Sequence, residues 1–298
     1  MDNTLINKAE PLSKELFAQY FQLSKFRLSV SVVGTTIITY FLGLYKTGLS
    51  FDWLLFFGLV IGGLLVVISA NALNQVIEID TDKLMSRTMD RPVANSKISK
   101  NDAIWFASVS VIIGLLMLTI LVNGRCALLS LLSFFIYVLA YTPLKKISPF
   151  AVFVGAVPGA LPASIGWIAV VGNIDDMAIL FFSIQFFWQF PHFWSIAWLL
   201  ENDYRKAGYT LLPSYEGRTK KNALQIIWYT GILFIITIYP VLSSKFSTIY
   251  SLIIIVPCAM YLLYRAYQLY SDLSEVSAKR LMFASLLYMP LILISYFF

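Results

Sequence analysis

The sequence predicts an all-α polytopic membrane protein with nine transmembrane helices, and three observations support that fold class. The 298 residues are 59% hydrophobic and only 13% charged, whereas charged residues make up about a quarter of a soluble globular protein. The apolar residues form repeated blocks close to the roughly 20 residues that span a bilayer. The basic residues concentrate in alternate connections. Together these properties exclude a soluble enzyme with one apolar anchor.

Charged or turn-rich segments bound each predicted span. In chain order the spans cover residues 28–46, 53–74, 103–122, 126–141, 150–171, 178–200, 223–242, 247–268 and 281–298. The N-terminal residues carry both signs of charge and lack the basic-then-apolar layout of a signal peptide. We therefore expect a cytoplasmic arm, residues 1–27, followed by one transmembrane domain, residues 28–298.

The distribution of basic residues predicts the orientation in the membrane. With the N-terminus in the cytoplasm, 19 of the 22 Lys and Arg residues lie inside, and only Lys46, Arg125 and Lys245 lie outside. The two long polar loops, about 75–102 and 201–222, then both face the cytoplasm. We expect a multi-pass protein of the bacterial inner membrane, with the lipid bilayer as its surroundings and no nucleic-acid partner.

The cysteine and histidine counts exclude several kinds of site. Cys126 and Cys258 both lie in or beside apolar segments, so neither a disulfide framework nor a thiolate metal site is expected. A single histidine, His192, excludes a metal centre built from several histidines.

The first long loop opens with polar oxygens at a regular spacing. Asn74, Glu78 and Asp82 recur every fourth residue, which turns the side chain by only about 40° per step on a helix. Carboxylate and amide oxygens on one face at the membrane surface suit Mg²⁺, which binds one or two carboxylates together with substrate phosphate and water. The alternative is that these acids only pair with neighbouring loop cations such as Arg87 and Arg91.

Basic residues near these acids suit a diphosphate. Arg87 and Arg91 follow the acidic face, and the guanidinium group matches phosphate oxygens in geometry. Lys145 and Lys146 lie in a short connection and are either further phosphate ligands or ordinary basic residues of a cytoplasmic loop.

A second charged cluster follows the sixth span. Asp203 is either part of a second metal site or an ion partner at a helix end, and Arg205 or Lys206 is a candidate diphosphate contact. Within the span, His192 is a proton carrier, a cofactor ligand or a hydrogen-bonded core residue. Trp188 and Trp194 flank it, and such rings stack on a flat macrocycle or shield a carbocation.

These stretches resemble the haem-farnesylating branch of the UbiA-type intramembrane prenyltransferases. The matching segments are Asn74-x3-Glu78-x3-Asp82, Met85-Ser86-Arg87-Thr88 with Arg91-Pro92, Tyr141-Thr142-x-Leu144-Lys145-Lys146, Gly159-Ala-x-Pro162 with Gly166-Trp167, Trp188-Gln-Phe-Pro-His-Phe-Trp194, and Asp203-Tyr204-x2-Ala207-Gly208-x2-Leu211-Leu212-Pro213. They occur in family order over roughly residues 25–215. The carboxylate spacing marks the superfamily, and the other segments point to the haem branch.

The resemblance implies a fold and an activity. We expect nine helices around a central cavity, a cap formed by the two cytoplasmic loops, and Mg²⁺-dependent transfer of farnesyl from farnesyl diphosphate to a vinyl group of haem b. The product would be haem O for haem-copper terminal oxidases, with a haem A synthase as a candidate partner.

The resemblance also implies roles for single residues. Asn74, Glu78 and Asp82 correspond to the first Mg²⁺-diphosphate motif and Asp203 to the second. The expected diphosphate contacts, which include two basic residues near the first span, are Arg87, Arg91, Lys145, Lys146, Lys206, Lys25 and Arg27. His192, Trp188 and Trp194 are the haem-side candidates. The chain departs from the family pattern at Lys146, Ala151, Phe26 and Leu211. These four differences affect the expected geometry of diphosphate binding and of helix entry, but none of them replaces a carboxylate.

Two other functions are compatible with parts of the pattern. A related prenyltransferase acting on an aromatic quinone precursor would use the same diphosphate residues. A secondary transporter would also have intramembrane polar residues, but it would concentrate them near the bilayer midplane and not on one membrane face.

Overall fold

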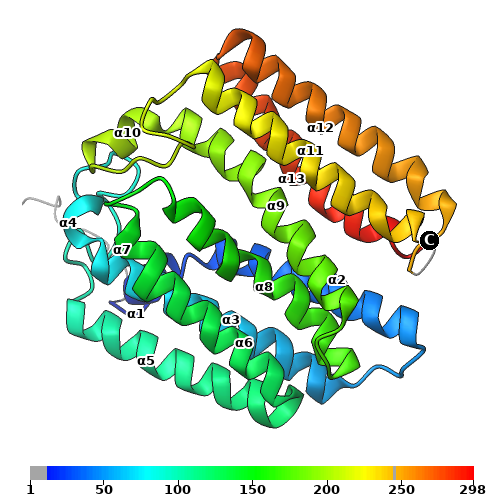
Figure 1. Cartoon of the computed structure of the whole chain (residues 1–298). Helices are drawn as coiled ribbons and strands as arrows, with labels where there is room; N and C mark the ends of the chain where they lie inside the picture. Colours follow the sequence, from blue (N-terminus) through cyan, green and yellow to red (C-terminus); the bar gives the residue numbers. More distant parts are fainter. Residues whose placement is uncertain (1–11, 244–245) are drawn as a thin grey trace, which may run out of the picture.

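A computed structural model describes residues 12–243 and 246–298 of the chain, and this part is helical with no β-strand. Long helices lie side by side in one bundle (Figure 1). In chain order they are α2 (Phe26–Thr47), α3 (Trp53–Ile77), α5 (Lys100–Met117), α6 (Gly124–Phe135), α8 (Ala151–Val171), α9 (Asp176–Leu199), α11 (Lys220–Leu242), α12 (Leu252–Asp272) and α13 (Glu275–Ser295). The predicted all-α class is confirmed. Residues 1–11 of the predicted arm, and Lys245, lie outside the described residues.

Short irregular turns extend three of these helices to bilayer length. The π-helix η1 (Leu118–Val122) continues α5, η2 (Ile136–Tyr141) joins α6 to α7 (Thr142–Leu144), and the 3₁₀ turn η3 (Ile249–Ser251) precedes α12. Eight of the described helical segments are then long and apolar enough to cross a membrane. The chain is thus an integral, multi-pass membrane protein.

Helix α9 corresponds to the remaining predicted span and differs from the others in composition. It has 24 residues, but Gln185, Gln189, Pro191 and His192 lower its apolar content, so it falls outside the set of eight. It packs against α8, α11 and α13 in the bundle, where neighbouring helices shield polar side chains from lipid. The predicted count of nine is therefore matched by nine long helices in the described part, of which eight meet the criteria for a span.

Helix α8 lies at the centre of the bundle. Of its most apolar stretch, 67% of residues are buried, against 22% for the segment containing α5. A side chain at Gly166 would meet the backbone carbonyl of Thr36, so glycine allows α2 to approach α8 closely. Pro162 cannot donate to the carbonyl of Pro158, and Ser133 Oγ donates to that oxygen instead at 3.2 Å. A neighbouring helix thus satisfies the carbonyl that the proline frees, as membrane helices require.

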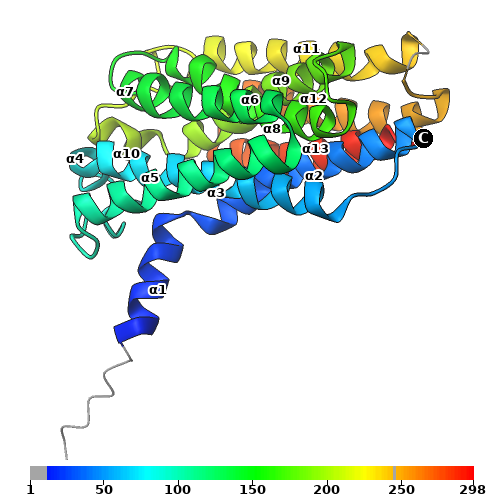
Figure 2. The ribbon, with the colours of Figure 1, turned by 90° about the horizontal axis from the view of Figure 1, so that it is seen from below.

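The short helices and the two long loops gather at one end of the bundle, here called the polar end (Figure 1). They are α4 (Ile79–Asp82), α7, α10 (Glu201–Lys206) and the segments that connect them to the long helices. Helix α1 (Leu12–Leu23) projects from the same end (Figure 2). Residues far apart in the sequence are thereby brought together on one side of the membrane.

One cavity lies at the polar end and another lies inside the bundle. One of about 190 Å³ lies under the loop after α10, at the polar end. A smaller one of about 40 Å³ lies between α2, α3, α6 and α8 and is lined by residues such as Val66 and Ile165. The single large central cavity that the resemblance implies stays a prediction.

Candidate functional site

The predicted acidic face forms where α3 meets α4. Helix α3 ends at Ile77, and Glu78 leaves helical geometry with φ −95° and ψ 11°. The four-residue spacing nevertheless continues, because the Glu78 N–H donates to the Asn74 carbonyl at 3.0 Å and the Asp82 N–H to the Glu78 carbonyl at 2.7 Å. Asn74, Glu78 and Asp82 are 1%, 3% and 0% exposed. The shared face is therefore present, although α3 and α4 are separated by a break at Glu78.

Glu78 is bound by groups from three segments of the chain. Its carboxylate forms an ion pair with the ammonium of Lys145, lies 3.7 Å from Nη1 of Arg91, and accepts the Tyr209 hydroxyl at 3.2 Å. The Tyr209 oxygen is also 2.7 Å from Thr81 Oγ1. Burial alone would raise the pKa of Glu78, but Lys145 and the other nearby cations outweigh it, so the pKa lies below its ordinary value. The carboxylate is therefore ionised at neutral pH.

Asp82 and Asn74 each have a cationic partner as well. Nη1 of Arg91 lies 2.7 Å from both carboxylate oxygens of Asp82. Nζ of Lys25 donates to Asn74 Oδ1 at 2.9 Å, and the Asn74 amide donates to Thr142 Oγ1 at 3.2 Å. Three basic side chains thus surround two carboxylates, an arrangement that suits an anionic ligand.

The backbone at Lys25 is strained in a way that aims its side chain. Lys25 joins α1 to α2 with φ 45° and ψ 48°, the left-handed region that non-glycine residues rarely adopt. Burial, and then repulsion by Arg91, hold the pKa of Lys25 well below its ordinary value. A strained backbone and a disfavoured buried charge are both typical of a binding site, and a bound anion would favour the charged form of Lys25.

Asp203 lies in a separate cluster. Its carboxylate accepts the backbone N–H groups of Ser86 and Arg87 at 3.1 and 3.4 Å, Ser86 Oγ at 2.9 Å and Lys206 Nζ at 3.3 Å. Partial burial opposes ionisation, but these donors hold the pKa of Asp203 below its ordinary value. The carboxylate thus connects α10 to the loop that carries Arg91, and the two polar loops form a joint cap.

The structure does not bring Asp203 together with the other acids. Among the described residues, no three His, Cys, Asp or Glu side chains are close enough to hold a metal ion. Asp203, which the sequence assigns to a second metal site, accepts hydrogen bonds from backbone donors of the neighbouring loop, and its role as a metal ligand stays a prediction. Asn74, Glu78 and Asp82 remain as the oxygen donors of one site.

Three predicted phosphate ligands have exposed side chains. Arg27, Arg87 and Lys146 are exposed, and none of them pairs with a carboxylate among residues 12–243 and 246–298. The network described above instead contains Lys25, Arg91 and Lys145, and Lys206 belongs to the Asp203 cluster.

The aromatic residues near His192 lie on two sides of α9. Two residues along a helix correspond to a rotation of about 200°, so the pair Trp188 and His192 faces away from the pair Phe190 and Trp194. The Trp188 and His192 rings stack at 4.8 Å, and Trp188 donates to the Ser285 carbonyl of α13 at 2.6 Å. They do not form one aromatic lining with Trp194.

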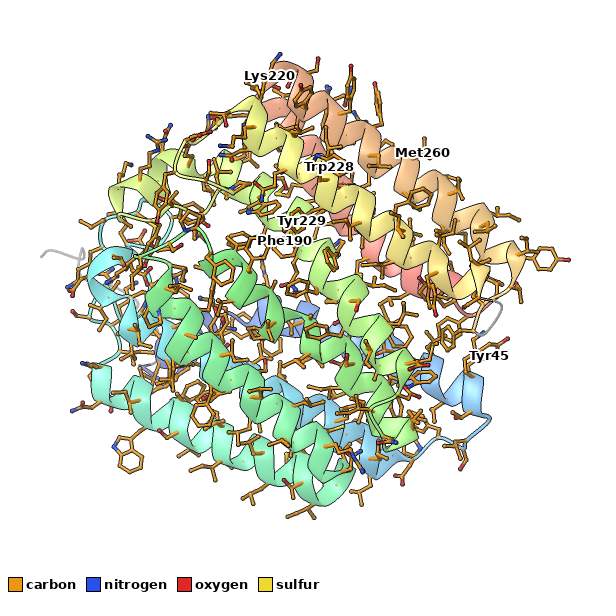
Figure 3. All side chains as sticks on the ribbon, in the orientation of Figure 1. Tyr45, Phe190, Lys220, Trp228, Tyr229 and Met260 are labelled. Atoms are coloured by element: carbon orange, nitrogen blue, oxygen red, sulfur yellow. The ribbon has the colours of Figure 1, made fainter. Side chains whose placement is uncertain are left out.

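The second pair packs toward α8 and α11. Phe190 and Tyr229 point toward one another inside the bundle, with ring centroids 4.6 Å apart (Figure 3). Trp194 is fully buried beside them, 5.1 Å from the Tyr229 ring, and its Nε1 has no hydrogen-bond partner in the described part. A buried donor without a partner is unusual and is a candidate contact for a polar ligand group.

Ser285 Oγ lies 2.9 Å from Nδ1 of His192 and 2.7 Å from the Met282 carbonyl oxygen. A serine hydroxyl that donates to this carbonyl accepts from the N–H of Nδ1, and the lone pair of the neutral imidazole is then on Nε2. Among the described residues, Nε2 has no hydrogen-bond partner.

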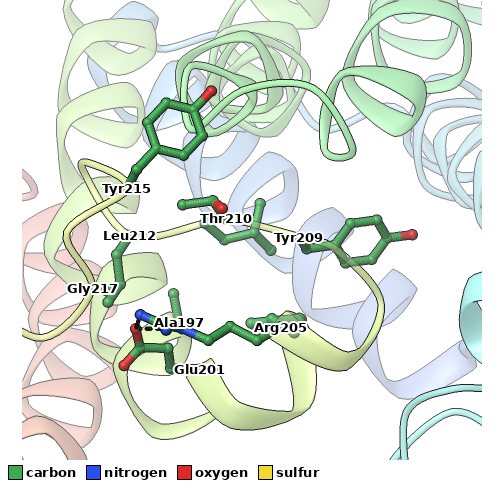
Figure 4. A pocket seen from close by; sticks show the side chains of 10 residues that line it. Ala197, Glu201, Arg205, Tyr209, Thr210, Leu212, Tyr215 and Gly217 are labelled. Carbon is green, nitrogen blue, oxygen red and sulfur yellow. Dashed lines mark hydrogen bonds and ion pairs between the residues drawn. The ribbon is translucent and has the colours of Figure 1, made fainter.

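The cavity of about 190 Å³ adjoins this site (Figure 4). Tyr209 contributes to its wall and also reaches Glu78. On the other side, the Glu201 carboxylate forms ion pairs with Arg205 at 2.7 Å and with Arg218 at 3.1 Å. Gly217, whose φ is 75°, lies close to the charged groups of Glu201 and Arg205. The cavity thus lies between the cap and the end of α9.

Comparison with known proteins identifies the family. The chain matches the model of the UbiA prenyltransferase family over residues 33–287. The chain belongs to this family. It is 41% identical to a protoheme IX farnesyltransferase of Cytophaga hutchinsonii, over 94% of this chain and 96% of that protein. The resemblance predicted from the motifs is thereby confirmed.

Solved structures show the same UbiA fold. A UbiA homolog from Archaeoglobus fulgidus bound to GPP and Mg²⁺ has a TM-score of 0.67 at 16% identity, over 93% of this chain and 99% of that one. A structure of digeranylgeranylglyceryl phosphate synthase has a TM-score of 0.76 at 18% identity, over 95% and 98% of the two chains.

Several residues of the site were not predicted from the sequence. Tyr209, Thr81, Thr142 and Ser285 carry the hydrogen bonds described above but were assigned no role. Gly208 was a usable signal for one of them, because its φ of 73° ends α10 and directs Tyr209 toward Glu78.

Proposed function

We propose that this chain transfers the farnesyl group of farnesyl diphosphate to a vinyl group of haem b, giving haem O for haem-copper terminal oxidases. The observation that carries the proposal is the buried network of Lys25, Arg91 and Lys145 around Asn74, Glu78 and Asp82. The similarity to a protoheme IX farnesyltransferase over nearly the whole of both chains supports haem b as acceptor.

The network is suited to a diphosphate bound at the polar end. Lys25 and Lys145 provide ammonium donors from two different helix ends, and Arg91 provides a guanidinium from the loop between them. Their excess charge would stabilise the diphosphate as it leaves. Lys206, Arg87, Lys146 and Arg27 stay candidate contacts, and those whose side chains are exposed would have to turn inward.

The same residues fit Mg²⁺. Asn74, Glu78 and Asp82 offer hard oxygen atoms on one face, and a magnesium ion completes its coordination with substrate phosphate and water. We propose these three as its protein ligands, and Asp203 as a residue that holds the cap closed or contributes through the bound diphosphate. Bound Mg²⁺ would neutralise charge on the diphosphate oxygens.

The reaction follows from these positions. The bond between farnesyl C1 and the diphosphate oxygen breaks, its electron pair stays on the diphosphate, and the terminal vinyl carbon of haem attacks C1. Water then adds to the haem-side cation and releases a proton. Aromatic side chains such as Phe190 and Tyr229 would exclude other water from the allylic cation.

The haem would bind deeper in the bundle than the diphosphate. His192 precedes the end of α9 by seven residues, or about 10 Å of helix. We propose that its free Nε2 faces the haem, that Trp188 supports the imidazole, and that Trp194 lines the region on the other face of α9.

The remaining features of the proposal concern the cell. We propose an orientation in the bacterial inner membrane with the N-terminus and the polar end in the cytoplasm, an arm of residues 1–27, and a transmembrane domain of residues 28–298. A haem A synthase is a candidate partner because it would consume the product.

The test uses the full chain in lipid nanodiscs with farnesyl diphosphate, Mg²⁺ and haem b. Mass spectrometry of the extracted pigment should show haem b with the masses of farnesyl and water added, and Asp82→Asn should show none. Prenylation of a hydroxybenzoate or dihydroxynaphthoate with haem b unchanged would instead assign the chain to a quinone pathway.

A further inference from the structure

Helix α1 has two chemically different faces, although it lies outside the bundle. At 100° per residue, its apolar side chains share one half of the helix: Leu16, Phe17, Tyr20, Phe21 and Leu23. Its polar side chains share the other half: Lys14, Glu15, Gln19 and Gln22. Such a helix is typical of a protein in contact with an apolar surface.

Most of the apolar face is uncovered by the described part of the chain. Phe17 is 72% exposed, Leu16 is 51% exposed and Phe21 is 43% exposed. Contiguous exposed aromatic and aliphatic side chains mark an interaction surface.

Contacts at the C-terminal part of α1 show what this surface adjoins. The Tyr20 ring lies 5.1 Å from the Phe106 ring of α5, and the Phe21 ring lies 4.9 Å from that of Phe26, the first residue of α2. Both partner rings belong to membrane-spanning segments. The apolar face of α1 therefore continues directly into the lipid-facing surface of the bundle.

The C-terminal end of α1 packs on the cap. Gln22 Nε2 donates to the carbonyl of Asp90, in the polar loop, at 3.5 Å. Leu23, at the end of the apolar face, is fully buried in a cluster with Val93 and Ile98 of that loop. The cap thus covers only the end of the apolar face, and Leu16, Phe17 and Phe21 stay uncovered.

We propose that α1 lies along the membrane surface at the polar end, with Leu16, Phe17 and Phe21 inserted between the lipids. Figure 2 shows α1 steeply inclined to the long axes of the bundle helices, as a helix in the plane of the membrane must be. A helix with one apolar and one polar face binds at the headgroup boundary in this way.

This anchor has a consequence for the site. Lys25 follows α1 directly and keeps its left-handed backbone between α1 and α2 while its ammonium reaches Asn74. A helix fixed on the membrane surface holds the connection between α1 and α2 in place. The proposed anchoring of α1 does not depend on which acceptor the site prenylates.

Spin labels test the proposal in the full chain. Single cysteines at positions 14–22, in a background with Cys126→Ala and Cys258→Ala, carry a nitroxide in vesicles of phosphatidylcholine and phosphatidylglycerol. Accessibility to oxygen relative to a water-soluble nickel complex should be several-fold higher at 16, 17 and 21 than at 15, 18 and 19, with helical periodicity. Equal access of the nickel complex to all positions would overturn the proposal.

A second measurement separates lipid from protein contacts. With the label at 16, Phe17→Ser combined with Phe21→Ser should lower the oxygen preference several-fold, while Glu15→Ser combined with Gln19→Ser should leave it unchanged. An unchanged preference in the phenylalanine variant would contradict lipid insertion. Dipolar broadening at 17 and 21 would also contradict it, because a second copy would then cover the face.

Discussion

The ion pair of Glu78 and Lys145 permits a test that separates stability from catalysis. The two side chains are 4% and 9% exposed, so each charge depends on the other for compensation. Glu78→Gln leaves the Lys145 ammonium buried without its carboxylate. Breaking such a pair from one side costs about 3–5 kcal/mol of folding free energy.

Removing both charges should restore most of that loss. In Glu78→Gln combined with Lys145→Met, no buried charge lacks its partner, and replacing a buried pair by uncharged groups is often close to neutral. We therefore expect the double variant to be less destabilised than the sum of the single variants by roughly 2–4 kcal/mol. Turnover should be lost in all three proteins, because the ligands of Mg²⁺ and diphosphate are gone.

The assay pairs unfolding with activity. Titration with sodium dodecyl sulfate, followed by circular dichroism, gives the free energy of unfolding, and mass spectrometry gives the yield of farnesylated haem. A coupling below about 0.5 kcal/mol would show that Glu78 and Lys145 do not compensate one another. Normal turnover in Glu78→Gln would refute the role of this carboxylate.

Further predictions concern single positions. Lys25→Gln removes one proposed charge-assisted contact to the diphosphate, worth about 1.5–3 kcal/mol, so the KM for farnesyl diphosphate should rise by an order of magnitude or more. Lys279→Gln, at an exposed lysine with no proposed role in the site, should change that KM less than about twofold in steady-state kinetics. Gly166→Ala should destabilise the protein by about 1–3 kcal/mol in the same unfolding titration, because its Cβ meets a backbone carbonyl, whereas Gly231→Ala has open space and should be neutral or slightly stabilising. Ser86→Ala removes one hydrogen bond to the Asp203 carboxylate of α10 and should cost about 0.5–1.5 kcal/mol, seen as faster proteolysis of the loop that carries Arg91. An unchanged rate of proteolysis would show that this hydrogen bond does not hold the loop to α10.

Much of the fold was predictable because the bilayer imposes it. Each predicted span overlaps a long helix, since backbone groups in lipid must be bonded within their own segment. The shared face of Asn74, Glu78 and Asp82 was also predictable, because residues four apart stay close on a helix even when it bends. The bend at Glu78 was not, since it depends on contacts with other segments.

The parts of the site that escaped prediction depend on loops and backbone. Asp203 has the residue type of a metal ligand, but its donors are the N–H groups of Ser86 and Arg87, which any sequence offers. The left-handed conformation of Lys25 has no sequence signal because lysine rarely adopts it. The two faces of α9, by contrast, follow from helical spacing alone. The sequence positions of His192 and Trp194 were therefore enough to predict that these side chains lie on different faces of the helix.

A competition experiment tests the central claim most directly. The full chain in nanodiscs receives limiting farnesyl diphosphate, Mg²⁺, and equal concentrations of haem b and a hydroxybenzoate, and both acceptors are followed by mass spectrometry. The account predicts that the farnesyl group appears on haem b together with one added water and that the hydroxybenzoate stays unmodified. Farnesylated hydroxybenzoate with unchanged haem b would contradict it.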